Sequence, residues 1–219
     1  MAKKYESIIF DLDGTLFQTD KLVIPAFQKT FEQLKMEGYE ISYMPDEREL
    51  LSVIGLTLDD VWQNLLPDVS KENYIKANNF LLENELSGVR AGYGALYPNV
   101  TDTLIELKNR GYRLFIASNG LKEYVYGITE EFRIDHYFDA IYSAGEFNTA
   151  TKKELVHKLV TEFEIKDGIM VGDRSSDVEA GKNNNLFVVG CSFGFSTEKE
   201  LESADKIIES IEQIFDVIT

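Results

Sequence analysis

The pattern of apolar and polar positions changes along the chain. From about residue 95 onward, short β-rich runs alternate with segments whose apolar residues recur at helical spacing. Continuous apolar runs of this kind are typical of strands buried in a parallel sheet. Four of them are "IIF" (8–10), "RLFIAS" (113–118), "GIMVGD" (168–173) and "LFVVGC" (186–191). Helical periods over 99–111 and 152–163 separate them, which predicts an α/β fold with a parallel sheet.

Residues 17–92 do not follow this alternation. They contain helical stripes and no convincing strand, which predicts a helical insertion between the first strand and the remaining α/β units. Thr57 and Ser70 stand where helix N-caps are expected. The exit from this segment, "SGVRAGYG", has three glycines and is a candidate hinge. The stripes are Val23, Phe27, Phe31 and Leu34; Leu58, Val61, Trp62 and Leu65; and Tyr74, Ala77 and Leu81.

Composition narrows the possible partners and locations. At 219 residues with 44% hydrophobic content, the chain is expected to form one large domain or a domain with an insertion. A net charge of −16 without a Lys/Arg cluster disfavours nucleic acid and anionic membranes. No apolar run approaches the roughly 18 residues of a membrane span. The single Cys191, expected as a buried strand thiol, fits a reducing compartment, and we predict a cytoplasmic protein.

Polar residues follow three of the expected strands at the point where each ends. Ligands of a parallel sheet bind beyond the carboxyl ends of its strands, so these residues should converge on one rim. Lys152 and Lys153 begin a helix near the same rim, where a cation is disfavoured unless it faces an anion. The strand-end residues are Asp11, Asp13, Gly14 and Thr15; Ser118, Asn119 and Gly120; and Gly172, Asp173 and Asp177.

The acidic motifs are too specific to be explained by strand termination. An Asx turn would account for one aspartate, but D-x-D-G-T is expected by chance in only about 0.2% of chains this long. Several carboxylates within a few ångströms repel one another unless a cation is bound or one is protonated. Oxygen ligands favour Mg²⁺, and the lysine and hydroxyl groups suit a phosphoryl group. One aspartate can attack phosphorus while its neighbour transfers protons.

The motifs "DLDGT", "ASN", "TKKELV" and "VGDRSSD" occur in this order. Together they resemble the four motifs of the haloacid dehalogenase-like phosphatase superfamily. The helical segment resembles the small cap of the branch that holds phosphoglycolate phosphatase and β-phosphoglucomutase. The resemblance implies a Rossmann-like doubly wound parallel sheet core (1–16 and 93–219) with an inserted α-helical cap domain (17–92).

Each role is carried over to a residue of this sequence. The resemblance implies that Asp11 is the nucleophile, and that Asp13 is the general acid/base and binds Mg²⁺ through its backbone carbonyl. It implies Asp11, Asp13, Asp173 and Asp177 as the metal site, and Thr15, Ser118, Asn119 and Lys152 as the phosphate site. Lys152 is preferred to Lys153 because the family's lysine comes first in similar motifs. Arg48, Thr57 and Lys76 are candidate cap residues for substrate choice.

The leading hypothesis is therefore a Mg²⁺-dependent phosphatase acting on a small phosphorylated metabolite. A phosphomutase using the same aspartyl-phosphate is the alternative, and a receiver-like regulatory module is the alternative that is not an enzyme. A carbon–halogen hydrolase is disfavoured because its reaction has no leaving oxygen for Asp13 to protonate. Phosphoglycolate, pyrophosphate, a nucleotide and a sugar phosphate all remain open as substrates. We expect a monomer or weak homodimer.

Overall fold

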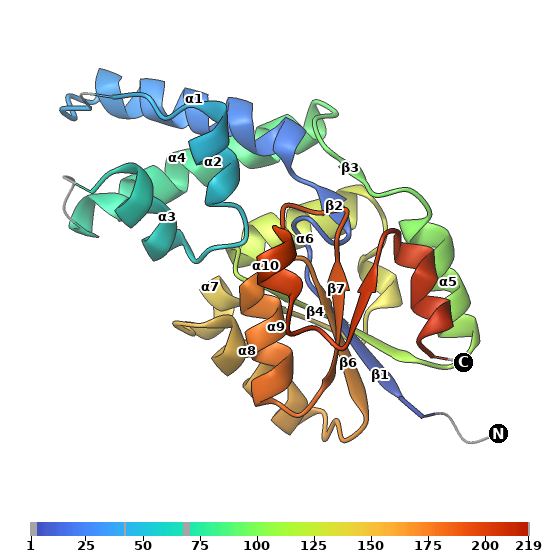
Figure 1. Cartoon of the computed structure of the whole chain (residues 1–219). Helices are drawn as coiled ribbons and strands as arrows, with labels where there is room; N and C mark the ends of the chain where they lie inside the picture. Colours follow the sequence, from blue (N-terminus) through green and yellow to red (C-terminus); the bar gives the residue numbers. More distant parts are fainter. Residues whose placement is uncertain (1–3, 42, 68–70, 219) are drawn as a thin grey trace.

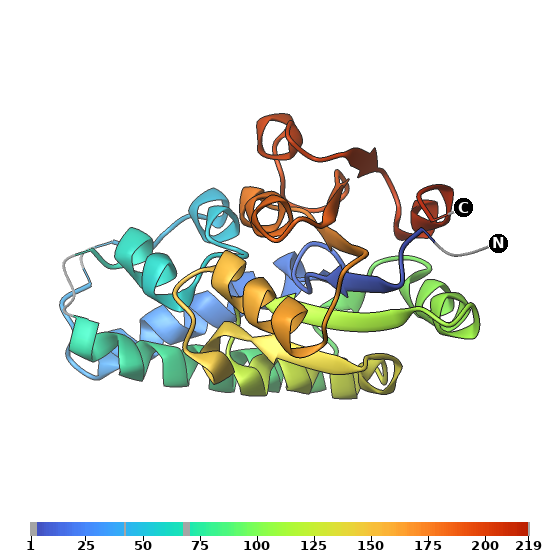
Figure 2. The same cartoon turned by 90° about the horizontal axis from the view of Figure 1, so that it is seen from below.

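The computed structural model describes residues 4–41, 43–67 and 71–218 and divides them between an α/β half and a helical half. Figure 1 shows the helical half at one end of the molecule, while both chain termini lie at the other end. Figure 2, turned by 90°, shows the same separation. Ser70, expected as an N-cap, lies outside the described residues. No helix in the described ranges combines the length and apolarity needed to cross a membrane.

The α/β half is built on a six-stranded parallel sheet in the order β5-β4-β1-β6-β7-β8. All four residues of the central β1 are buried, and Ile9 pairs with Phe115 on one side and Met170 on the other. From β1 the chain adds β4 and β5 on one side and then β6, β7 and β8 on the other. The strand order therefore reverses beside β1, which is where α/β sheets form their ligand crevice. The strands are β1 (Ser7–Phe10), β4 (Arg113–Ser118), β5 (Ala140–Ser143), β6 (Gly168–Gly172), β7 (Phe187–Cys191) and β8 (Lys206–Ile208).

Helices cover both faces of the sheet, as a doubly wound fold requires. Alternation along β1 sends Ile8 and Phe10 to one face, where they pack in a cluster with Leu104 of α5. Ile9 points to the other face and packs with Leu155 of α8. Cys191 ends β7 as a buried free thiol, as expected. The helices are α5 (Val100–Asn109), α6 (Lys122–Glu131), α7 (Ala144–Phe147), α8 (Lys152–Glu162), α9 (Ser175–Asn183) and α10 (Glu198–Leu201), with 3-10 turns at Asp135–Tyr137 and Ile211–Asp216.

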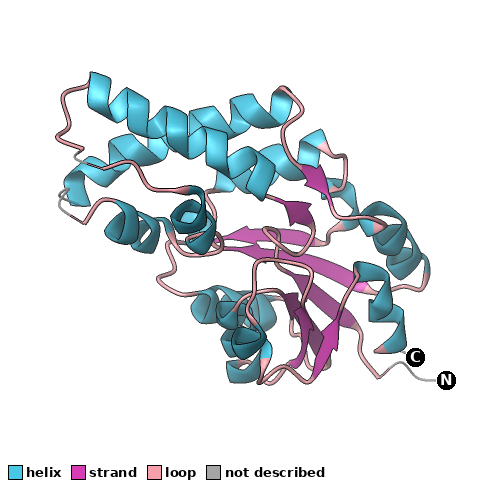
Figure 3. Cartoon of the chain, turned by 45° about the horizontal axis from the view of Figure 1, so that its top comes forward, coloured by secondary structure: helices cyan, strands magenta, loops and turns pink. Residues whose placement is uncertain are grey.

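The helical half, which we call the cap, has an apolar core of its own. Trp62 lies at its centre and makes an edge contact with Phe27 at a ring separation of 5.7 Å. Thr57 caps α3 by accepting a hydrogen bond from the Asp60 amide, as its place in the sequence predicts. Figure 3 shows these helices apart from the six-stranded sheet. They are α1 (Asp20–Met36), α2 (Glu47–Ser52), α3 (Leu58–Leu65) and α4 (Lys71–Arg90).

Two short strands carry the chain into and out of the cap. β2 (Phe17–Gln18) and β3 (Ala95–Leu96) pair in an antiparallel ribbon, so both connections lie side by side. In the glycine-rich exit, Gly88 lies within α4, whereas Gly92 and Gly94 have φ values of +82° and +81°. At Gly94 a Cβ atom would lie 2.2 Å from the Phe17 ring, so the ribbon itself requires glycine there.

Candidate active site

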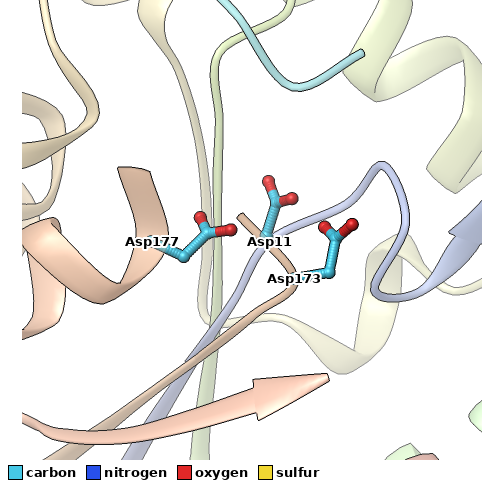
Figure 4. A group of neighbouring side chains, drawn as sticks. All are labelled: Asp11, Asp173 and Asp177. Carbon is cyan, nitrogen blue, oxygen red and sulfur yellow. The ribbon is translucent and has the colours of Figure 1, made fainter. Parts of the chain in front are cut away.

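Three aspartates from three different segments meet at the carboxyl end of the sheet. Asp11 follows β1, and its amide donates to the Val171 carbonyl at 2.9 Å, which continues the parallel ladder. Asp173 follows the neighbouring β6, and Asp177 lies in the first turn of α9. All three are buried, and one oxygen of each lies within 4.8 Å of the others. Figure 4 shows Asp11 between Asp173 and Asp177.

Lys152 is the positive charge of this cluster. Its ammonium group forms ion pairs with Asp11 and with Asp177, the latter at 2.8 Å, and only 3% of the residue is exposed. Burial alone would lower the pKa of Lys152, but the two carboxylates outweigh it and raise that pKa above its ordinary value. Lys153 lies on the surface, with its ammonium group 3.9 Å from the Glu179 carboxylate. The two neighbouring lysines therefore have different surroundings, and only Lys152 faces the aspartates.

The cluster has more negative charge than Lys152 can balance. Burial raises the pKa of Asp11 well above its ordinary value, and Lys152 only partly offsets this rise. Burial, followed by the charge of Asp177, raises the pKa of Asp173 to about 7. Asp11 Oδ2 is buried without a hydrogen-bond partner among the described residues. An all-oxygen donor set with an unpartnered carboxylate oxygen fits a hard divalent cation such as Mg²⁺.

The loop after β1 fits closely against Asp173. Gly14 has a φ of +82°, and a Cβ atom on it would lie 2.4 Å from Asp173 Oδ2. Thr15 donates its hydroxyl hydrogen to Asp173 Oδ1 at 3.4 Å, a long contact. The Phe195 amide donates to Asp173 Oδ2 at 2.6 Å. Two separate segments thus orient one carboxylate, and no sequence pattern identifies the contribution of Phe195.

Asp13 lies apart from the three clustered carboxylates and has a different set of partners. Its Oδ1 accepts hydrogen bonds from the Thr19 hydroxyl at 2.6 Å and from the Tyr124 hydroxyl at 2.5 Å. Burial raises the pKa of Asp13, while these two hydrogen bonds act to lower it. Thr19 precedes α1 and lies only six residues after Asp13, whereas Tyr124 of α6 is brought to Asp13 by the fold from 111 residues away. Sequence reasoning missed both residues because each stands alone in its segment.

Ser118 and Asn119, at the end of β4, lie beside the aspartates as expected. The Ser118 hydroxyl oxygen accepts a hydrogen bond from the Gly120 amide at 3.1 Å. The Asn119 side-chain amide donates to the Gly55 carbonyl of the cap at 2.8 Å. Arg174 makes a second link, because its guanidinium donates to the Ser52 carbonyl at 3.3 Å. The cap is therefore held over the carboxyl end of the sheet.

A cavity of about 70 Å³ lies between the cap and the sheet, with Asp11 and Asp13 at its floor. Glu85 of α4 lines the cap side, although only 9% of it is exposed. Burial, with a smaller contribution from Asp13, raises the pKa of Glu85 well above its ordinary value. Sequence reasoning missed Glu85, although it stands four residues after Leu81 and so continues the buried stripe of its helix. Its polar neighbours in the lining are Thr19, Asn78, Ser118, Asn119 and Tyr124.

The three candidate cap residues lie outside this lining. Arg48 is exposed on α2. Lys76 forms an exposed ion pair with Glu37. The Thr57 side chain caps the start of α3. It lines a neighbouring cleft that is also lined by Lys152 and Lys153. The structure brings the predicted core residues together but does not place these three beside Asp11.

Several known proteins with similar sequences are phosphatases. The chain is 32% identical to the phosphoglycolate phosphatase of Aquifex aeolicus, over 80% of this chain and 79% of that protein. It is 26% identical to the pyrophosphatase PpaX of Halalkalibacterium halodurans, over 97% and 96% of the two chains. The crystal structure of CbbY from Rhodobacter sphaeroides in complex with phosphate has the same fold, with a TM-score of 0.81, 22% identity and 96% coverage of both chains.

A sequence profile of one family extends across both halves of the molecule. The profile described as haloacid dehalogenase-like hydrolase matches residues 8–191. This range includes the cap, all of the clustered aspartates, Lys152 and all of β1 except Ser7. Because the match covers well over half of the 219 residues, the chain belongs to the haloacid dehalogenase-like hydrolase family.

Proposed function

We propose that this phosphatase hydrolyses a small phosphomonoester with the help of Mg²⁺, through an aspartyl-phosphate formed on Asp11. The observation that carries the proposal is the Asp11 carboxylate itself. It lies at the floor of the cavity, and its Oδ2 has no hydrogen-bond partner among the described residues. Asp177 Oδ1 is also without a hydrogen-bond partner in the described part of the chain, but of these two aspartates only Asp11 lines the cavity, where an unpartnered oxygen is available to attack phosphorus.

The reaction has two steps, and in each step one bond to phosphorus forms while another breaks. In the first, an Asp11 oxygen forms a bond to phosphorus while the bond from phosphorus to the leaving oxygen breaks, and Asp13 gives that oxygen its proton. In the second, Asp13 takes a proton from water as the water oxygen attacks phosphorus. The acyl-phosphate bond breaks, inorganic phosphate leaves, and Asp11 regains its carboxylate.

The environment of Asp13 supports its role as the proton donor. Thr19 and Tyr124 both donate to Oδ1. This fixes the side chain and leaves Oδ2 to carry the proton. Burial raises the pKa of Asp13, which favours its protonated form before the first step. Asp11 and Asp13 therefore have different environments suited to different roles.

The remaining residues are assigned by what they contact. Asp11, Asp173, Asp177 and the backbone carbonyl of Asp13 would hold Mg²⁺, whose positive charge would stabilise the charge on the transferred phosphoryl group. Lys152, Ser118 and Asn119 would bind the phosphoryl oxygens. Thr15 donates to Asp173, so we assign it to positioning that carboxylate. The cytoplasmic location and the monomeric or weakly dimeric state stay predictions.

The test is phosphate release from a panel of phosphomonoesters with Mg²⁺. The Asp11→Asn protein is expected to lose at least about a thousandfold in kcat, because removal of a nucleophile has effects of this size or larger. Asp102→Asn, at an exposed position of α5, is the control and should keep full activity. Substantial residual turnover by Asp11→Asn, well above a thousandth of the wild-type rate, would contradict the nucleophile assignment. Isomerised sugar phosphate without free phosphate would instead indicate a phosphomutase.

A further inference from the structure

The buried carboxylate of Glu85 has no structural task that explains its place in the cavity. It reaches the cavity from α4 of the cap, opposite the floor that holds Asp11 and Asp13. In the part of the chain that the structure describes, no lysine, arginine or histidine forms an ion pair with it. A buried acid without a partner is costly to fold, which suggests that its partner is a ligand.

The cavity lining has no positively charged side chain among the described residues. Two cations lie close to this lining but are already paired. Lys152 pairs with Asp11 and Asp177, and Arg174, which lies against Gly55 of the lining, pairs with Glu200. The cap wall is otherwise mostly apolar and includes Val23, Phe27 and Leu81. A leaving group with a second negative charge would thus face Glu85 with no positively charged side chain in the described lining to balance it.

Asn78 provides a hydrogen-bond donor on the cap side of the cavity. Its Oδ1 accepts a hydrogen bond from Trp62 Nε1 at 2.5 Å. The indole nitrogen can only donate, so the amide orientation is determined and the NH₂ group of Asn78 remains available. Asn78 lines the same cavity as Glu85. The wall therefore offers one hydrogen-bond acceptor and one donor, which together match a hydroxyl group.

We infer that Glu85 is a specificity residue that accepts a hydrogen bond from a hydroxyl group of an uncharged, short leaving group, and that the cavity rejects phosphomonoesters bearing a second anion. The inference rests on the proposed function, since it takes the ligand to be a phosphomonoester. The cavity between the cap and the sheet measures about 70 Å³, which favours a short leaving group. Phosphorylated small polyols belong to the favoured class, and phosphorylated carboxylic acids belong to the rejected class.

The test compares the binding of two matched esters to the Asp11→Asn protein in Mg²⁺ by calorimetry. Glycerol 3-phosphate and 3-phosphoglycerate differ only in a terminal hydroxymethyl or carboxylate group. We expect glycerol 3-phosphate to bind at least about tenfold more tightly. Equal affinities, or a preference for 3-phosphoglycerate, would overturn the inference without any need for turnover.

A second substitution assigns this preference to Glu85. At a pH above the raised pKa of Glu85, Glu85→Gln, added to Asp11→Asn, should narrow the ratio of the two affinities at least about threefold, because glutamine cannot carry the negative charge that repels the carboxylate. Glu83→Gln, at an exposed position of the same helix, should leave the ratio unchanged. The affinity for inorganic phosphate should be similar in all three proteins and so reports an intact core. An unchanged ratio in a Glu85→Gln protein that still binds phosphate would contradict the role of Glu85.

The proposed function and this inference fail in different ways. If the wild-type protein releases no phosphate from any ester while Asp11→Asn binds glycerol 3-phosphate preferentially, the hydrolysis proposal fails and the specificity stands. If the wild-type protein hydrolyses both esters with equal kcat/KM and Asp11→Asn binds them equally, the specificity fails and the hydrolysis proposal stands.

Discussion

Lys152 and Lys153 show how much the position of one side chain decides at the residue scale. Thr151 caps α8, which begins with Lys152, and this start directs Lys152 to the aspartates and Lys153 to the surface. We expect Lys152→Met to reduce phosphate release by about 10²–10³-fold, as expected on losing a group that stabilises charge in the transition state. It should also destabilise the fold by about 3–5 kcal/mol without metal, because it leaves buried carboxylates unpaired.

Lys153→Met is the matched control. It removes an exposed lysine and should change the free energy of unfolding by no more than about 0.5 kcal/mol, with kcat unaffected. Phosphate release and urea unfolding measure the two effects separately. Equal loss of activity in the two variants would mean that both lysines contact the phosphoryl group, contrary to the positions seen here.

Glu85 should make stability depend on pH. Burial, and to a lesser extent Asp13, raises its pKa, and the buried Tyr124 lies near both acids. The folded protein then holds the Glu85 proton more tightly than the unfolded chain does. Stability from this group is present at low pH and falls as pH rises above the ordinary glutamate pKa of about 4.3, until the folded pKa is passed.

Glutamine cannot ionise, so the stability advantage of Glu85→Gln over the wild-type protein should grow as the pH is raised from 4.5 to 8. The expected gain at pH 8 is of order 1–3 kcal/mol, the cost of a buried unsatisfied polar group. Thermal unfolding at both pH values measures the difference, with exposed Glu83→Gln as the control. A gain that is the same at both pH values would show that the effect is one of packing and not of ionisation.

At the scale of elements, the loop between β1 and β2 brings a glycine with a left-handed backbone conformation into close contact with a site residue. Gly14 and Gly38 both have a left-handed φ, +82° and +88°, but they differ in their surroundings. An added Cβ would collide with the Asp173 carboxylate at Gly14, whereas at Gly38 it would meet nothing within 4 Å. Comparing alanine substitutions at Gly14 and Gly38 therefore distinguishes the effect of backbone strain from the effect of displacing Asp173.

Alanine at Gly38 should cost only the strain of a left-handed residue, about 1–2 kcal/mol, and leave kcat unchanged. Alanine at Gly14 should cost more than this. It should also reduce kcat by about tenfold or more, because displacement of a site residue by about 1 Å can cost about 10²-fold. Urea unfolding and phosphate release provide both measurements. Full activity in Gly14→Ala would show that the close contact with Asp173 is not needed for the reaction.

The elements that were predictable are those whose sequence reflects burial on both faces. β1, β4, β6 and β7 are apolar runs in the interior of the sheet, and their pattern identifies them as strands. The edge strands β5 and β8 were not predicted: β8 has only three residues, and Lys206 and Ile207 are exposed. Such edges are strands because a neighbouring strand pairs with them, and a local pattern does not contain that information. The two-residue strands β2 and β3 depend on pairing in the same way.

The residues of the candidate site also fall into a predictable group and a group that the sequence does not predict. Asp11, Asp173 and Ser118 were placed together because they end strands of one parallel sheet, so topology alone brings them close. Tyr124 and Glu85 reach the cavity through the packing of α6 and the cap against the sheet, whereas Thr19 is close to Asp13 in the sequence. That packing depends on close helix contact, since a Cβ on Gly127 of α6 would lie 2.4 Å from Leu86 of α4. Contacts of this kind join residues far apart in sequence and leave no local motif.

At the scale of the whole molecule, two kinds of negative charge respond to different ions. The net charge of −16 is spread over the chain, and any salt screens the repulsion between exposed charges. The three clustered aspartates are buried and have only Lys152 as a positive partner among the described residues. Screening reaches buried charges much less, so a bound divalent cation should stabilise them in a way that NaCl does not.

We therefore expect Mg²⁺ to raise the melting temperature of the wild-type protein more than NaCl at equal ionic strength. At one hundred times its dissociation constant, a ligand that binds only the folded state stabilises it by about 2.7 kcal/mol. For a chain of this size that is roughly 5–10 °C. Asp173→Asn should lose most of the Mg²⁺ increment and keep the NaCl increment, because it removes one ligand and little surface charge. The melting temperature of each protein is compared with and without added salt. Any stability that Asp173→Asn gains from relieved repulsion is therefore present in both measurements and cancels. Equal effects of the two salts on wild type would mean that Mg²⁺ acts only by screening, and that the aspartate cluster does not hold it.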